Sequence, residues 1–208
     1  MAKLKLPFIF GPVGGAQETP KCLLNYIKGH EKNEKLRSIM NQCLILLPSY
    51  KKALAHADLI YCSNIETENV IKRHINKKEF YKIHKLTELG INDSYLNERK
   101  TLSHGNSKVV HVLISGRLIY RKGVELLIDS VSQLNTESPY IIDIYGDGEQ
   151  RHMLEKKVKT YQLENRIVFH GNISFTEMQK QYEKADIYCL PSFRETTGTA
   201  VFEAMANK

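Results

Sequence analysis

Short apolar segments alternate with amphipathic helical segments from residue 109 to the end of the chain. The pattern predicts strands at 109–115, 140–145, 166–170 and 186–190, and helices at 124–134, 150–161, 175–184 and from Gly198. Strands that alternate with helices pair in parallel, because each helix carries the chain back to the edge where the next strand starts. We therefore expect an α/β fold with a parallel sheet in this half of the chain.

The first hundred residues show this alternation less completely. We expect strands at 7–10 and 58–62, helices at 20–26, 34–55 and 67–75, and a loop at 11–15. One face of the 34–55 helix carries more apolar surface than two or three short strands can cover: Leu36, Met40, Cys43, Leu44 and Leu47. The polar segment 88–107 predicts an interdomain connection. The predicted domains are residues 1–100, with the connection extending to about 107, and residues 108–208.

The helix expected at 175–184 has a clear start signal. Ser174 and Glu177 form the pattern of a capping box, in which each side chain bonds the backbone N–H of the other residue. Met178, Tyr182 and Ala185 then share one helix face. We assign that face to the core, without a role in binding.

Composition narrows the class of protein. The chain has 208 residues, 42% hydrophobic content and a net charge of +7, without a membrane-length apolar stretch or signal-peptide pattern, which predicts a cytosolic globular protein. The charge fits a solvated basic surface, peripheral contact with an anionic membrane, or an anionic nucleotide substrate. Nucleic acid is the weakest interpretation, because basic residues are not interleaved with aromatic ones. The four cysteines stand singly, which predicts reduced core thiols and no metal site.

Two carboxylates, Glu195 and Glu203, have seven residues between them. The strand expected at 186–190 ends before Pro191, and the helix from Gly198 carries Glu203 in its second turn. Glu195 therefore lies in a strand-to-helix loop. Such loops lie at the carboxyl ends of parallel strands, where α/β sheets bind ligands and helix N-termini offer N–H groups to phosphate. The pattern predicts a site for a polyol and a phosphate.

A second loop supplies cations. The segment from Gly116 to Gly123 follows the strand at 109–115 and contains Arg117 and Lys122. On so short a loop both side chains can face one crevice, and a guanidinium can bind phosphate oxygens through two parallel hydrogen bonds. The pattern favours a diphosphate site over two ordinary surface cations.

Together these segments resemble the retaining glycosyltransferases of family 4. The stretch from Glu195 to Glu203 resembles the E-x7-E motif of that family, and the segment from Gly116 to Gly123 resembles its G-R-L-x-x-x-K-G loop. The segments 144–148 and 168–171 and the final Glu-Ala-Met-Ala also follow the family's order. The resemblance implies a GT-B fold of two Rossmann-like domains with parallel sheets, the first on the acceptor side and the second binding the donor, both incomplete in this chain.

The activity that this resemblance implies is transfer of a hexosyl-type sugar, with retention, from a nucleotide-diphosphate sugar. The implied acceptor is a glycan or lipid-linked molecule in bacterial surface polysaccharide synthesis, at the inner face of the plasma membrane, and no cofactor is implied. Gly116, Arg117 and Lys122 are expected to hold the donor diphosphate, and Glu203 to bind the ribose hydroxyls.

The resemblance also implies the contacts of the donor sugar. Glu195 is expected to touch it, beside the backbone N–H groups of Thr197 and Gly198, and to be catalytic together with Arg117 and Lys122. The sequence reads Glu-Thr-Thr-Gly where the family has Glu-Gly-Phe-Gly, which leaves the sugar open. The loop with Gly14 and Gly15 resembles one that lines the cleft in a family subgroup, although a plain tight turn explains it about as well.

Two other functions stay open. A glycoside hydrolase would place Glu195 and Glu203 on either side of one bond, as acid and nucleophile, and would not need a basic phosphate loop. A noncatalytic nucleotide-binding protein would keep that loop without transferring a sugar. Because the resemblance covers only the middle of a GT-B enzyme, we expect this fragment alone to be inactive.

Overall fold

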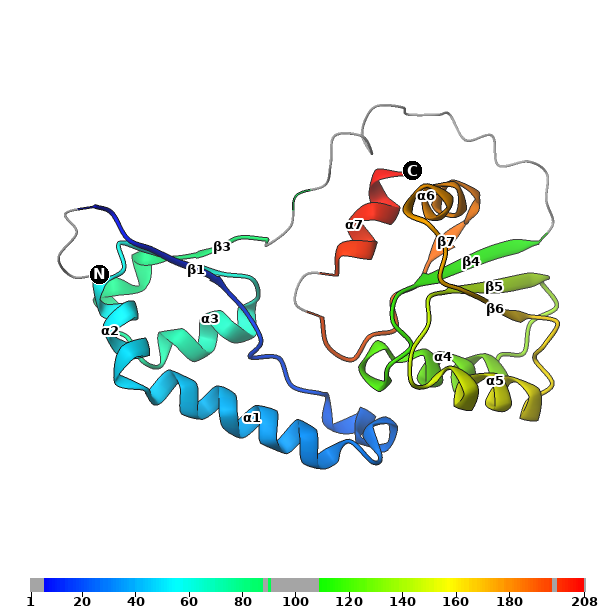
Figure 1. The fold of residues 1–208 in the computed structure, drawn as a ribbon, viewed down its shortest axis with the longest axis horizontal. Helices are drawn as coiled ribbons and strands as arrows, with labels where there is room; N and C mark the ends of the chain where they lie inside the picture. Colours follow the sequence, from blue (N-terminus) through cyan, green and yellow to red (C-terminus); the bar gives the residue numbers. More distant parts are fainter. Residues whose placement is uncertain (1–5, 88–89, 91–108, 196–197, 208) are drawn as a thin grey trace. The chain divides into compact units, whose positions relative to one another are not determined.

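The computed structural model describes residues 6–87, 90, 109–195 and 198–207. The chain divides into two compact units, Met1–Gly90 with Arg194–Thr197, and Ile91–Phe193 with Gly198–Lys208. Each unit has its own sheet, and every strand pair in both sheets is parallel (Figure 1). The expected α/β fold with two Rossmann-like parallel sheets is confirmed.

The first unit is built on a sheet of β1 (Ile9–Val13), β2 (Leu59–Cys62) and β3 (Ile83–Lys85), in that order. Its helices are α1 (Glu31–Leu46), α2 (Pro48–His56) and α3 (Ile65–Lys72), with 3-10 helices η1 (Lys21–Ile27) and η2 (Lys77–Lys82). The core residues are contributed by α2, β2 and α3: Leu54, Ala57, Ile60, Cys62 and Ile71.

Three details of the first unit differ from the sequence-based prediction. The single helix expected at 34–55 is two helices, because Pro48 begins α2 and the residue before it, Leu47, is extended with φ −60° and ψ 136°. The expected loop at 11–15 overlaps β1, which continues through Gly11 where a Cβ would lie 2.4 Å from the carbonyl oxygen of Tyr61. β3 was not predicted, because it has only three residues and two of them are basic or imidazole side chains.

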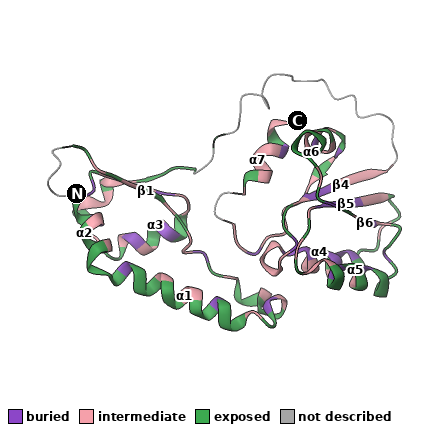
Figure 2. Ribbon diagram, viewed as in Figure 1, coloured by how far each residue is buried: buried purple, intermediate pink, exposed green. Residues whose placement is uncertain are grey.

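The apolar face of α1 is exposed within the described part of the first unit. Leu36 and Met40 of α1 retain 59% and 54% of their accessible surface, and Leu47 directly after it retains 46%, in agreement with the expectation (Figure 2). The prediction of core thiols holds only in part: Cys62 is buried and Cys189 half-buried, whereas Cys22 and Cys43 are exposed, and all four are free. The connection expected at 88–107 lies, except for Gly90, outside the described residues.

The second unit has a four-stranded sheet in the order β6-β5-β4-β7. Its strands are β4 (Val110–Ser115), β5 (Tyr140–Tyr145), β6 (Ile167–Gly171) and β7 (Ile187–Tyr188). Its helices are α4 (Val124–Ser132), α5 (Arg151–Thr160), α6 (Phe175–Lys184) and α7 (Thr199–Ala206). β7 is shorter than expected, yet the N–H groups of Asp186 and Cys189 still donate to β4 carbonyls at 2.9 Å.

Successive side chains of β4 and β5 point to opposite faces of the sheet, so each strand packs against two helical layers. Ile114, Ile142 and Ile144 pack with residues of α4 and α5 in one buried cluster. Leu113 and Tyr145 pack on the opposite face with Tyr182 of α6 and residues of α7. The sheet therefore lies between two helical layers and holds the loops at its carboxyl ends in place.

The predicted capping box of α6 is present. The Ser174 hydroxyl accepts from the Glu177 N–H at 3.3 Å, and the Glu177 carboxylate accepts from the Ser174 N–H at 2.9 Å. We expect Ser174→Ala to destabilise the protein by about 1 kcal/mol, because one N–H group of the first turn loses its acceptor. Urea unfolding would measure this loss, with Ser132→Ala at the end of α4 as the matched control. An equal loss in both variants would contradict the cap assignment.

Candidate functional site

The loop between β4 and α4 carries the predicted cations. Its last residues form a 3-10 turn, Tyr120–Lys122, which ends at Gly123 with φ +69°. A Cβ on Gly116 would lie 3.8 Å from Cε of Lys122, so the lysine stem returns over the start of the loop. Arg117 is exposed, its carbonyl oxygen accepts from the Ile119 N–H at 2.9 Å, and no hydrogen bond or ion pair joins its guanidinium to the described residues. The structure therefore brings Gly116 and Lys122 together at the carboxyl end of β4 and leaves the Arg117 guanidinium available there.

Backbone atoms pack directly beneath this loop. A Cβ on Gly146, where φ is +122°, would lie 2.0 Å from the carbonyl oxygen of Gly116, and one on Gly148 would lie 2.5 Å from that of Leu118. Hydrogen bonds join the same segments, from the Gly116 N–H to Tyr145 O at 3.0 Å and from the Leu118 N–H to Asp147 O at 2.9 Å. The loops after β4 and β5 therefore form one layer, whose close approach only glycine permits.

Glu203, on α7, lies in the same unit, and its carboxylate is hydrogen-bonded to a side chain of α6. Its Oε2 accepts a hydrogen bond from the Tyr182 hydroxyl at 3.0 Å, and that hydroxyl lies 2.9 Å from Oγ of Ser115, the last residue of β4. Burial raises the pKa of Tyr182 far above its ordinary value, so its hydroxyl keeps its proton. Sequence reasoning placed Tyr182 in the core correctly, since only 2% of it is exposed, but missed the contact of its hydroxyl with Glu203.

Glu195 belongs to the first unit with the segment Arg194–Thr197, whereas the chain up to Phe193 and from Gly198 onward belongs to the second. Its carbonyl oxygen accepts from Nε2 of Gln17 at 2.7 Å, and Nη2 of Arg194 donates to Oε1 of Glu34 at 2.7 Å. Glu195 and Glu203 thus belong to different units. Thr197 lies outside the described residues, and Gly198 takes the left-handed conformation, with φ +66°, immediately before α7.

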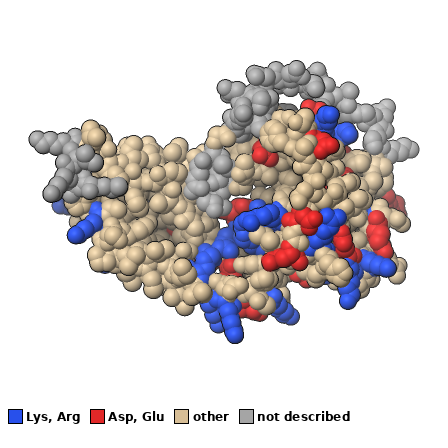
Figure 3. All heavy atoms as spheres, viewed as in Figure 1, with Lys and Arg blue, Asp and Glu red and all other residues tan. Residues whose placement is uncertain are grey.

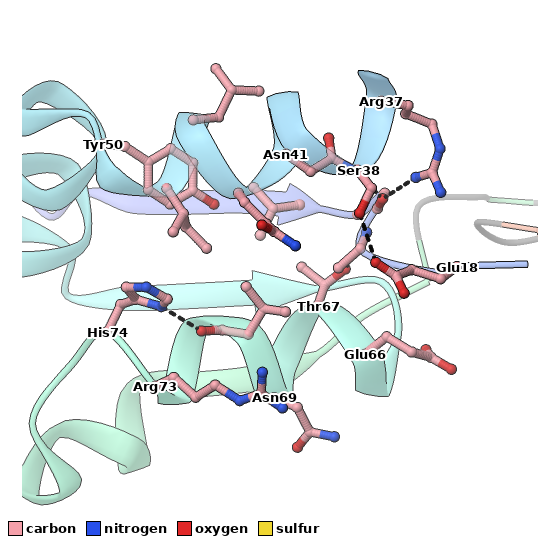
Figure 4. Close-up of a pocket in the computed structure, with 18 of the residues that line it drawn as sticks. Glu18, Arg37, Ser38, Asn41, Tyr50, Glu66, Thr67, Asn69, Arg73 and His74 are labelled. Atoms are coloured by element: carbon pink, nitrogen blue, oxygen red, sulfur yellow. Dashed lines mark hydrogen bonds between the residues drawn. The ribbon is translucent and has the colours of Figure 1, made fainter. Parts of the chain in front are cut away.

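Gly14 and Gly15 line a pocket of about 1040 Å³ in the first unit, between α1, α3 and the end of β1 (Figure 4). The carbonyl oxygen of Gly15 accepts from Arg37 at 3.1 Å and from Asn41 at 2.8 Å, which fixes the loop against α1. One end is polar, with Glu18, Arg37 and Ser38, whereas Tyr50 and His74 lie at the other end. The pocket thus offers hydroxyl-binding groups beside an apolar and aromatic wall.

A polar cluster on β4, β5 and β6 was not predicted. The Asp143 carboxylate lies 2.7 Å from Nε2 of His170 and 3.2 Å from Nδ1 of His111, and the His170 ring stacks on Tyr145 at 4.4 Å. His170 is therefore held by neighbouring side chains at the end of β6. The hydrogen-bonded pair Asp143 and His170 could be found from the sequence only with the strand register, which places Asp143 beside Val168.

Charges on the visible face of the second unit are mixed in sign (Figure 3). Between α4 and α5, the Lys157 ammonium donates to Glu125 at 2.7 Å and to Asp129 at 2.8 Å. No group of three or more His, Cys, Asp or Glu residues suited to a metal ion occurs in the parts of the chain that the structure describes. Within the same parts, every helix is too short or too polar to cross a lipid bilayer.

Among curated proteins, the chain is 31% identical to protein CapJ of Staphylococcus aureus over 82% of its own length and 42% of that protein. It is 29% identical, over 58% of its length and 33% of the relative, to an N-acetyl-D-galactosaminyltransferase of Campylobacter jejuni whose name gives a diNAcBac-PP-undecaprenol-linked glycan. The chain thus spans less than half of these relatives.

Among solved structures, the HepE protein of Anabaena in complex with UDP has the same fold, with a TM-score of 0.58 at 19% identity. The match covers 78% of this chain and 49% of HepE. A family model, described as glycosyl transferases group 1, matches residues 97–208, which is more than half of the chain. The chain therefore belongs to the glycosyl transferases of group 1.

Proposed function

We propose that the protein transfers a hexosyl-type sugar, with retention of the anomeric configuration, from a nucleotide-diphosphate sugar, in the manner of glycosyltransferase family 4. The observation that supports this proposal is that the Lys122 side chain lies over Gly116 at the end of β4. In the same unit, hydrogen bonds through Tyr182 connect the Glu203 carboxylate to Ser115, the last residue of β4. This arrangement offers cations to a diphosphate and a carboxylate to a ribose. The UDP bound by HepE, a protein of the same fold, is consistent with such a donor.

Arg117 and Lys122 would stabilise the leaving diphosphate. Negative charge develops on the phosphate oxygen as the glycosidic bond breaks, and cations placed beforehand lower the barrier most. Arg117 can bind through two parallel hydrogen bonds, and Lys122 acts as a compact charge. We propose that these two side chains neutralise the phosphate charge that a metal ion neutralises in other transferases, and that no cofactor is needed.

Glu203 would bind the ribose hydroxyls, because an ionised carboxylate accepts hydrogen bonds from two neighbouring hydroxyl groups. Glu195 would contact the donor sugar, and the N–H groups of Thr197 and Gly198 would complete its binding. In this mechanism the leaving phosphate takes the acceptor proton on the same face of the sugar, and no protein nucleophile is required. Product anomer analysis by NMR tests retention directly.

For the acceptor, we propose that the pocket lined by Gly14 and Gly15 binds glycan hydroxyls. Its polar end offers Ser38 and Asn41, while Tyr50 provides an aromatic surface for a sugar ring. The lipid-linked glycan in the name of the Campylobacter relative supports an acceptor of that class. A role in bacterial surface polysaccharide synthesis would place the protein in the cytoplasm, in peripheral contact with the inner face of the plasma membrane, with no nucleic-acid partner.

The two alternative functions, a glycoside hydrolase and a noncatalytic nucleotide-binding protein, can each be distinguished from a transferase. Membership of the glycosyl transferases of group 1 favours transfer over hydrolysis, and a hydrolase would not need Arg117 and Lys122. A noncatalytic nucleotide-binding protein would retain nucleotide affinity without transferring a sugar. Transfer by the enzyme to any acceptor, measured with a radiolabelled donor sugar, excludes that alternative.

The two glutamates should differ in what they contribute. We expect Glu203→Ala to weaken binding of the free nucleotide by about 1.5–3 kcal/mol, because it loses hydrogen bonds to an ionised acceptor. Glu195→Ala should leave nucleotide affinity nearly unchanged and lower kcat, because its partner is the sugar. Calorimetry with UDP and GDP, together with kinetics, measures both effects, and exposed Glu164→Ala is the matched control. Equal losses of nucleotide affinity in both variants would remove the distinction between the two roles.

A further inference from the structure

A chain of partly buried hydroxyl groups leads from the end of β4 to the carboxylate of Glu203. The Tyr182 hydroxyl lies 3.0 Å from Oε2 of Glu203 and 2.9 Å from Oγ of Ser115. The Tyr188 hydroxyl follows, 3.2 Å from Oγ of Ser115 and 3.5 Å from the carbonyl oxygen of the same residue. The four side chains come from β4, α6, β7 and α7, so the network joins the sheet to two helices.

Each hydroxyl group has one proton to donate, and this determines the direction of the hydrogen bonds. An ionised Glu203 can only accept, so Tyr182 must donate its single proton to it. The Tyr182 oxygen then accepts from the Ser115 hydroxyl, and Tyr188 donates to Ser115. Burial raises the pKa of Tyr182 above its ordinary value, so its hydroxyl keeps the proton that it donates.

This network holds one carboxylate oxygen and leaves the other for a ligand. Oε2 of Glu203 is bound to Tyr182, whereas Oε1 has no hydrogen-bond partner among the described residues. A glutamate on a helix surface would otherwise sample several rotamers, and ordering it would oppose ligand binding. Tyr182 removes that freedom before the ligand arrives.

We propose that Tyr182 is a positioning residue for Glu203: its hydroxyl orients the carboxylate so that the ribose of the donor nucleotide meets a fixed acceptor. The inference rests on the proposed ribose role of Glu203. It adds that the ability to distinguish a ribose from a deoxyribose depends on a tyrosine that does not touch the nucleotide. A tyrosine that serves only to fill the core would not affect that discrimination.

Tyr182→Phe keeps the ring in the core and removes the hydroxyl alone. We expect it to weaken binding of UDP or GDP about tenfold and to reduce the preference for each over its 2′-deoxy form by a similar factor, as for one hydrogen bond to a charged group. Calorimetry on the folded protein measures all four nucleotides. Tyr188→Phe is the matched control, because its hydroxyl contacts only Ser115 among the residues of the network, and it should change the preference less than threefold.

A double-mutant cycle separates this inference from the proposed function. If Tyr182 acts through Glu203, then Tyr182→Phe should have no further effect on nucleotide binding in the Glu203→Ala background. Wild-type discrimination in Tyr182→Phe, or an effect that adds to that of Glu203→Ala, would overturn the inference and leave the ribose role intact. Wild-type binding by Glu203→Ala would instead overturn the ribose role itself. If Tyr182→Phe does not fold, Ser115→Ala takes its place in the cycle, because it removes the hydroxyl that donates to Tyr182.

Discussion

Gly146→Ala is expected to lower the stability of the second unit by about 3–6 kcal/mol, the sum of backbone strain at a positive φ and of severe overpacking. The added Cβ would lie 2.0 Å from the carbonyl oxygen of Gly116, and φ at this position is +122°. Because the clash is with backbone, no side-chain rotation relieves it. The substitution must push apart the loops after β4 and β5, and the Gly116 end of the cation loop would move with them.

The experiment compares Gly146→Ala with Gly171→Ala in the same unit. Gly171 also has a positive φ, of +75°, but a Cβ there would lie 3.1 Å from Nη1 of Arg151, at the flexible end of a side chain. We expect a loss of about 1–2 kcal/mol in this control, from the left-handed backbone alone. Urea unfolding followed by circular dichroism measures both midpoints. Similar midpoints for the two variants would show that the close approach of the two loops does not contribute to stability.

Lys122→Ala is expected to weaken UDP or GDP binding by about 1.5–3 kcal/mol, which is roughly a 10- to 150-fold increase in Kd, as for a charge-assisted hydrogen bond to phosphate. The lysine stem lies over Gly116, at the end of β4 where ligands of α/β sheets bind. The loss should be largest for the nucleoside diphosphate and much smaller for the nucleoside, because the ammonium is assigned to phosphate.

Arg121→Ala provides the matched control for this variant. Arg121 precedes Lys122 in the same 3-10 turn, and no contact with the donor is assigned to its side chain. Calorimetry with UDP, uridine, GDP and guanosine would measure both variants, and raising the salt concentration should weaken diphosphate binding in the wild type more than in Lys122→Ala. Equal affinity of Lys122→Ala and wild type for the diphosphates would refute the assignment of this side chain.

The second unit is predicted well because its local signals agree with one another. Ser174 and Glu177 begin α6 where the capping box indicates, and β5 has the bounds expected from its apolar pattern. The first unit has weaker signals. β3 has three residues and too little pattern to detect, and the break at Pro48 falls inside an otherwise continuous helical pattern.

The candidate site is predicted in part, and the limit has a physical cause. The glycines and cations of the loop after β4 can be located from the sequence, because residue type and spacing alone place them after a predicted strand, and their role in binding phosphate stays a prediction. Tyr182 cannot be linked to Glu203 in this way. It lies on the apolar face of α6 and is interpreted as core, and only the packing of α6 against α7 brings its hydroxyl to the carboxylate. The same holds for Asp143, whose two histidine neighbours lie on other strands.

The contact of Gly123 with the strand-end segment at Pro191 bears on how donor preference can change in proteins built this way. A Cβ on Gly123 would lie 2.1 Å from the carbonyl oxygen of Pro191, so no larger residue fits there without moving the chain. Natural or laboratory changes in the choice of nucleotide or sugar must therefore occur at positions whose side chains point away from this tightly packed backbone. A library aimed at a new donor should keep these glycines fixed, together with Arg117 and Lys122, to which we assign the diphosphate that every such donor shares.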